Sequence, residues 1–174
     1  MTRPKINIEK KWFEKVIEIL TFGLFILSAI VIGIYYSDLP EKLPIYFNWP
    51  TKDENGLGTK DLLWVSPITF GIIGLVIYRL NKSPWIFNYP TEINEKNAER
   101  NYKYATQMLR ILGFTIGIVC LSLTLSSISN GLGNNTDFDK YLYPLLPIIL
   151  ILVPIVCIVK MITDKKTMHN NGYK

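Results

Sequence analysis

The sequence has few side chains that could act as a nucleophile, a general base or a metal ligand, and their spacing does not match any catalytic arrangement. Two cysteines, Cys120 and Cys157, lie in apolar stretches, and the single histidine, His169, lies in a polar tail. A metal site needs several ligands at suitable spacing, and a nucleophile needs a base within reach. The sequence therefore predicts no catalytic residues, no metal site, no cofactor and no enzymatic activity.

The two cysteines and the acid nearest to an apolar stretch have simple structural interpretations. From the helix rise per residue, Cys120 and Cys157 are expected at depths that differ by roughly 10 Å. A disulfide needs Cα atoms within about 7 Å of each other, so both cysteines are expected to carry free thiols. Glu18 lies at the edge of the first apolar run. Its carboxylate is expected to reach the membrane interface, with a functional intramembrane acid as the alternative.

The elements that position these side chains are predicted from four long runs of uncharged residues. They span residues 19–37, 62–78, 111–136 and 141–159. Hydrophobic residues make up 49% of the 174-residue chain and charged residues 19%, and the charges lie between the runs. A soluble helical bundle, the alternative, would need a polar face on each helix. A bilayer core about 30 Å thick is crossed by roughly 20 apolar residues in a helix, which pairs its backbone groups within one segment.

We therefore expect an all-α integral membrane protein whose single membrane domain comprises residues 16–160, between an N-terminal segment (1–15) and a C-terminal tail (161–174). The four transmembrane helices are expected at about 16–37, 62–78, 109–129 and 141–159.

The distribution of basic residues predicts the orientation of these helices, because Lys and Arg favour the cytoplasmic side. The two terminal segments and the central loop hold 15 of them, and the first and third loops hold four. Both termini are thus predicted in the cytoplasm, in a multi-pass membrane protein. This topology accounts for the net charge of +5, which is therefore not taken as a sign of nucleic-acid binding.

The first loop between spans, predicted to lie outside, combines prolines, glycines and aromatic residues. Proline keeps the residue before it extended, and glycine permits tight turns. We expect an ordered cap over the outer mouth of the bundle, either as an interfacial anchor without a ligand or as a binding surface. The residues expected to form it are Leu39, Pro40, Pro44, Tyr46, Phe47, Asn48, Trp49, Gly56, Gly58 and Lys60.

The central loop, predicted to be cytoplasmic, leads into the third span through an amphipathic helix. Asn94 is of a type favoured at helix N-caps, and apolar residues follow at helical spacing up to Leu112. This stripe is expected to pack on the bundle or the headgroups, with a docking face for a cytoplasmic regulator as the alternative. The residues assigned to such a docking face are Asn88, Tyr89, Pro90, Asn97, Arg100 and Tyr102.

Two glycines and a proline inside the predicted spans bear on helix packing. Gly113 and Gly117 form a GxxxG pair, which lets helices approach closely. The pair has two interpretations, packing within one chain and a homodimer. Pro154 lies inside the fourth span and is expected to kink it.

Two sets of residues in these loops occur together in a known family. In the first loop they are Leu39-Pro40, Leu43-Pro44, Phe47-Asn48, Gly56, Gly58 and Lys60. In the central loop they are Asn88-Tyr89-Pro90, Asn97-Ala98, Tyr102 and Met108-Leu109. With them the chain resembles, over roughly residues 16–130, the amino-terminal membrane domain of SdpI-type bacterial immunity proteins. It departs from the family pattern at Tyr46, Thr51 and Asn55, where histidine, glycine and aspartate are usual.

The resemblance implies a non-enzymatic membrane protein that confers immunity to, or senses, a peptide toxin or signal at the outer face. It further implies that the first loop meets the peptide and that the central loop meets a cytoplasmic regulator. Because Tyr46 and Asn55 replace the family's histidine and aspartate, we expect the loop to act through shape rather than through proton or metal chemistry. The alternative is an accessory subunit of a membrane complex or transporter.

Overall fold

The computed structural model of the chain describes residues 3–44, 56–134 and 138–171, with the backbone alone for 138–143, 146 and 164–171. Its elements are the helices α1 (Trp12–Tyr35), α2 (Val65–Leu80), α3 (Ala98–Gly131) and α4 (Phe138–Asn171), the strands β1 (Lys42–Pro44) and β2 (Leu57–Thr59), and the short 3-10 helices η1 (Lys60–Trp64) and η2 (Pro84–Ile86).

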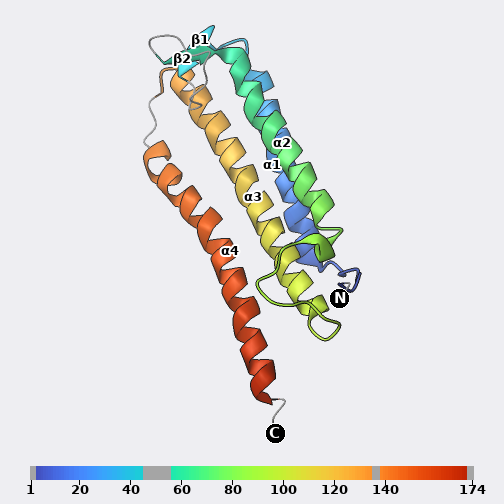
Figure 1. Cartoon of the computed structure of the whole chain (residues 1–174). Helices are drawn as coiled ribbons and strands as arrows, with labels where there is room; N and C mark the ends of the chain where they lie inside the picture. The colour runs from blue at the N-terminus through green and yellow to red at the C-terminus, as the bar shows by residue number, and fades with distance from the viewer. Residues whose placement is uncertain (1–2, 45–55, 135–137, 172–174) are drawn as a thin grey trace.

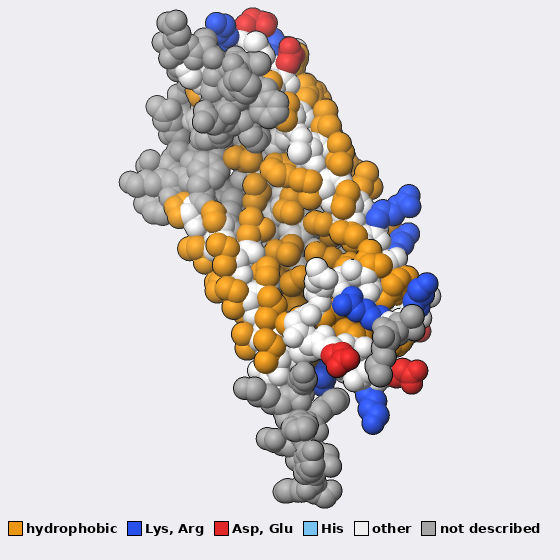
Figure 2. Space-filling model, viewed as in Figure 1, with side chains coloured by type: hydrophobic (Ala, Val, Ile, Leu, Met, Phe, Trp, Pro, Cys, Tyr) orange, Lys and Arg blue, Asp and Glu red, His pale blue; other side chains and the backbone are white. Residues whose placement is uncertain are grey.

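The helices run alternately up and down, with α1, α2 and α3 side by side and α4 against α3 (Figure 1). The strands lie at one end of the bundle, here called the hairpin end. At the other end, here called the charged end, α1 begins, α2 ends and α3 begins. Figure 2 shows apolar side chains over the middle of one face and charged side chains toward its two ends.

In the described part of the chain, three helical stretches are long and apolar enough to cross a membrane. They are Trp12–Tyr35, Lys60–Leu80 and Ala98–Gly131, and a shorter apolar stretch lies in α4 at Pro147–Thr163. Many large apolar side chains on α1, α2 and α4 point outward, such as Ile19, which is 71% exposed. An apolar surface of this extent fits contact with lipid, so the helical character and apolar spans expected from the sequence are confirmed.

The glycine pair of α3 lies inside the bundle rather than on its surface. A Cβ at Gly117 would come within 3.0 Å of the Leu24 side chain on α1, and one at Gly113 would touch Thr21 and Ile77. Both glycines are buried. Of the two interpretations of this pair, these contacts fit packing within one chain, because a homodimer through it would first have to open the contact between α1 and α3.

Several element boundaries differ from those expected. Helix α3 has Asn97 as its N-cap rather than Asn94, because the Asn94 side chain accepts the backbone N–H of Lys96 and so forms a turn before the helix. Helix α4 continues to Asn171, with Pro154 inside it, so the expected polar tail is largely helical.

We predict opposite effects for alanine at two glycines on neighbouring turns of α2. A Cβ at Gly74 would lie 2.6 Å from the Phe25 ring, whereas one at Gly71 would meet nothing within 4 Å. Gly74→Ala should therefore lower the free energy of unfolding by about 1–3 kcal/mol through overpacking. Gly71→Ala should leave it unchanged or raise it by up to about 1 kcal/mol through helix propensity.

Thermal unfolding of both variants in one detergent measures this difference. Equal melting temperatures for the two variants would contradict the close packing of α1 on α2 at Gly74.

Candidate functional site at the hairpin and charged ends

The hairpin is a short antiparallel ladder whose register fixes the ends of the connection between its strands. Lys42 pairs with Thr59, and Pro44 pairs with Leu57. The backbone N–H of Lys60 donates to the Glu41 carbonyl (3.1 Å) and extends the ladder. Whatever path the connecting residues take, their two ends therefore lie side by side.

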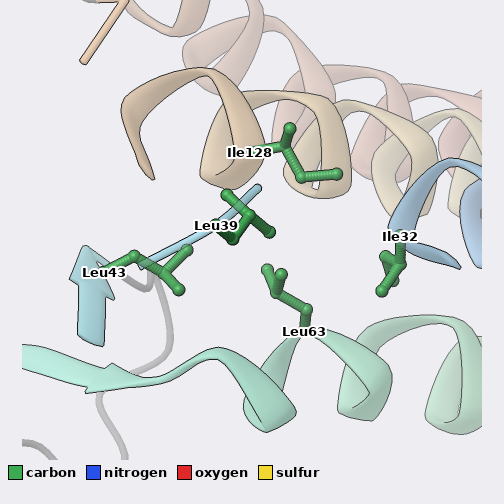
Figure 3. Close-up of a cluster of buried hydrophobic side chains, with 5 residues drawn as sticks. All are labelled: Ile32, Leu39, Leu43, Leu63 and Ile128. Carbon is green, nitrogen blue, oxygen red and sulfur yellow. The ribbon is translucent and has the colours of Figure 1, made fainter. Parts of the chain in front are cut away.

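Two buried leucines pack the hairpin against the bundle. Leu39 and Leu43 are 4% and 0% exposed and pack with Ile32 of α1, Leu63 of η1 and Ile128 of α3 (Figure 3). A full leucine burial is worth about 1.5–3 kcal/mol where the alternative is water. The described parts of the loop thus pack on this end of the bundle, and the cap over the outer mouth stays a prediction.

The last turn of α3 is shaped to receive these leucines. A Cβ at Gly131 would lie 2.9 Å from a methyl of Leu39 and 3.3 Å from one of Leu43. A Cβ there would force these leucine side chains to shift. Sequence reasoning gave no role to this glycine, whose function depends on contacts with residues far away in the chain.

Lys60 fastens the hairpin to the end of α1 by polar contacts. Its Nζ lies 2.9 Å from a carboxylate oxygen of Glu41 and 4.8 Å from the centre of the Tyr36 ring. The Tyr36 hydroxyl donates a hydrogen bond to Asp61. This hydrogen bond, followed by burial and the negative charges of Asp61 and Glu41, raises the pKa of Tyr36, so the phenol stays neutral to higher pH than usual.

The described residues of the predicted loop thus have different roles. Leu39 and Gly58 are buried, and Pro40 and Pro44 are exposed. Gly56 has φ +75°, as expected for a turn that favours glycine. The other loop residues assigned from the sequence, Tyr46, Phe47, Asn48 and Trp49, lie outside the described residues.

At the charged end, α1 and α3 are joined by a buried cluster of charges. Arg110 of α3 lies between two acids of α1, with its Nε 2.9 Å from Glu18 and its Nη1 3.6 Å from Glu14. The side chains of Arg110 and Glu14 are 2% and 1% exposed. Buried ionised groups are tolerated only when paired.

Further partners complete the cluster. Glu14 also accepts hydrogen bonds from the Lys11 backbone N–H (2.8 Å) and from the Gln107 side chain (2.8 Å). Lys10 lies 2.7 Å from the second oxygen of Glu18. Two cations thus face two carboxylates, and the formal charges cancel.

The pairing of Glu18 within this cluster was not predicted from the sequence, and its place at the membrane interface stays a prediction. The Glu18 carboxylate is turned toward α3 and held by two cations. The signal was present in the sequence, because Glu14 and Glu18 are four residues apart on α1 and share one helix face. Arg110 was used only to predict the orientation of the helices, so its pairing with these two acids was missed.

The aromatic residues of the central loop hold the N-terminal arm of the chain. The Tyr102 hydroxyl donates to the Pro4 carbonyl (3.0 Å), and Arg3 donates to the carbonyls of Trp85 and Phe87. The Arg3 guanidinium also lies over the Tyr89 ring, at 5.7 Å from its centre.

These contacts bear on the docking face expected from the sequence. Tyr102 is fully buried, and Tyr89 is partly buried and donates to the Pro84 carbonyl (2.8 Å). Burial raises the pKa of Tyr89 far above its usual range. Asn88 and Pro90 are exposed. The expected packing of the amphipathic stripe on the bundle is therefore observed. The two tyrosines contribute to this packing with their buried rings and are not part of an exposed docking face.

Neither described cysteine forms a disulfide, as expected. Cys120 lies beside Ser66 of α2, with 3.9 Å between sulfur and hydroxyl, and Cys157 lies 3.5 Å from the Tyr104 carbonyl. In the described part of the chain, no three His, Cys, Asp or Glu side chains are grouped so that they could hold a metal ion.

Comparison of the chain with protein families, with curated proteins and with solved structures finds no match. The resemblance to SdpI-type immunity proteins therefore stays a prediction that rests on the loop residues.

We predict that Arg110→Gln destabilises the protein strongly, because it leaves Glu14 and Glu18 buried without their shared cation. Removing one partner of a buried ion pair costs about 3–5 kcal/mol. Arg79→Gln is the matched control, since Arg79 is an exposed arginine at the end of α2.

Chemical unfolding in detergent measures both variants. Combining Arg110→Gln with Glu14→Gln should recover part of the loss, because Glu18 then keeps Lys10 as its cation and Glu14 no longer carries a charge. An Arg110→Gln variant as stable as Arg79→Gln would show that the cluster does not hold α1 to α3.

Proposed function

We propose that this chain is a non-enzymatic protein of the bacterial cytoplasmic membrane that recognises a peptide toxin or signal with its hairpin end. The proposal includes four membrane spans, with both termini in the cytoplasm and the hairpin outside. The observation that supports it most is the fastening of the hairpin by buried leucines and by Lys60. Strands held this firmly give recognition a rigid base, because residues that are already ordered lose little freedom on binding.

The sequence between the paired strands supports a peptide ligand. Residues 45–56 include Tyr46, Phe47 and Trp49, and aromatic residues are enriched among those that dominate binding energy at interfaces. Their ends are fixed by the register of the ladder. The resemblance to SdpI-type immunity proteins points the same way, since it assigns this loop to the peptide.

A cytoplasmic regulator, also implied by that resemblance, would bind at the charged end. The surface left for it includes the exposed Asn88 and Pro90 and the half-buried Asn97 and Arg100. Tyr102 would contribute indirectly, by holding the N-terminal arm in place.

The orientation is tested with reporter fusions. Fusions after Lys15, Lys96 and Lys166 should report the cytoplasm, and fusions after Lys52 and Asn135 the outside, because basic residues are concentrated in the segments expected inside. An outside signal at Lys96 would contradict the proposed topology.

Recognition is tested by the survival of a deletion strain, challenged with peptide toxins and complemented with variants. Gly56→Ala should reduce protection, because φ +75° strains an alanine in the hairpin. Gly133→Ala is the matched control: it has φ +79° in the connection between α3 and α4, and it should protect as the parent chain does. Tyr46→Phe should also protect, since it keeps the ring.

Immunoblots establish that each variant reaches the membrane in equal amount. The proposal fails if Gly56→Ala protects fully, or if Gly133→Ala loses protection to the same extent. Loss of protection by Tyr46→Phe alone would place the function in the hydroxyl rather than in the shape of the loop.

A further inference from the structure

Helix α4 is joined to the rest of the bundle by a narrow contact near the charged end. Cys157 and Met161 are its buried described side chains, and they pack with Ala105 of α3. Several other described side chains of α4, such as Ile151 and Ile155, are about half exposed or more. The contact between α3 and α4 is thus incomplete, unlike that between α1 and α3.

Two adjoining cavities lie along this contact. The larger, of about 540 Å³, is bounded by α3, α4, the end of α2 and residues 87–90. The smaller, of about 240 Å³, lies between α3 and α4. Met108 and Cys157 line both. The larger volume falls within the range of roughly 300–1,000 Å³ that is typical of ligand pockets.

The chemistry of the walls restricts the occupant. The larger cavity is lined by apolar side chains such as Leu109, Pro154 and Ile158, with Asn88 at its edge. The hydroxyl of Tyr89, another lining residue, is already bonded to the Pro84 carbonyl. A polar ligand or a peptide backbone would leave its own polar groups unpaired here, at a cost of several kcal/mol per group.

One cation lies beside these apolar walls. Lys160 of α4 is exposed and lines the smaller cavity, and the sequence continues with Lys165 and Lys166. On α2, Arg79 next to Leu80 marks the same end of the apolar span. Basic pockets between membrane helices bind anionic lipid headgroups.

We propose that these joined cavities form a lipid site that holds an acyl chain of an anionic phospholipid, with the phosphate at Lys160. The inference rests on the chain spanning a membrane and is independent of peptide recognition. The bilayer supplies this ligand directly, because the groove lies between two apolar helices at the end where their charged residues begin. The bound chain completes the packing of α4 on α3.

Two isoleucines of α4 on successive turns provide a matched pair of variants. Ile158 lines the larger cavity and is 42% exposed, whereas Ile162 is 39% exposed and lies outside the lining of both cavities. Ile158→Trp should fill the groove with an indole ring. Ile162→Trp makes the same change one turn further along α4, on a side chain that lines neither cavity.

The experiment uses the full chain purified in mild detergent, with native mass spectrometry to count bound phospholipid. The parent chain and Ile162→Trp should retain one phospholipid, and Ile158→Trp should retain several-fold less. After delipidation, added phosphatidylglycerol should bind in preference to phosphatidylcholine, and Lys160→Gln should remove that preference.

Cys157 provides a second readout that does not depend on a variant. Its alkylation by N-ethylmaleimide, followed by peptide mapping, should slow several-fold when phosphatidylglycerol is added. Equal retention of lipid by the two tryptophan variants, or an unchanged alkylation rate, would overturn the proposal. Protection of Cys157 that rises with protein concentration without added lipid would assign the groove to a second copy of the chain instead.

Discussion

Apolar helices gain little in a bilayer by packing leucine against leucine, because acyl chains offer an equally apolar surrounding. In the proposed membrane setting, the contact between α1 and α3 therefore depends on interactions that lipid cannot supply. These are the pairing of Arg110 with Glu14 and Glu18, and the close approach at Gly117. A buried arginine without its acids would be costly, so the ion pairs also fix the depth and rotation of α3 against α1.

Helix α3 contacts the structures at both ends of the protein. At the hairpin end, Gly131 of α3 receives Leu39 and Leu43, and at the charged end Tyr102 of α3 binds the N-terminal arm. A continuous helix is stiff along its axis and connects the two surfaces. A ligand that displaced the hairpin would therefore act on the end of α3, and the buried charge cluster would resist sliding of that helix.

The sequence predicted the apolar helices, and it indicated that the first loop packs on the bundle, because both depend on local composition. Long uncharged runs and Leu-Pro pairs can be recognised without knowledge of the fold. It did not predict the partners of Arg110 or Tyr102, because these contacts join residues that are distant in the chain. Helix α4 was expected to end near residue 160, since hydropathy shows where an apolar span ends and not where a helix does.

The resemblance to SdpI-type immunity proteins extends to about residue 130, and the tightly packed part of the structure ends at the same place, with α3 at Gly131. Helix α4 lies beyond it and has no described ion pair like that of Arg110 to hold it. Its described contacts with α3 are apolar and centred on Cys157 and Met161. In lipid such contacts depend on close fit, and the cavities beside them show that the fit is incomplete. The first three helices and the hairpin are thus the part that can present a rigid binding surface, and the position of α4 depends on what fills the groove beside it.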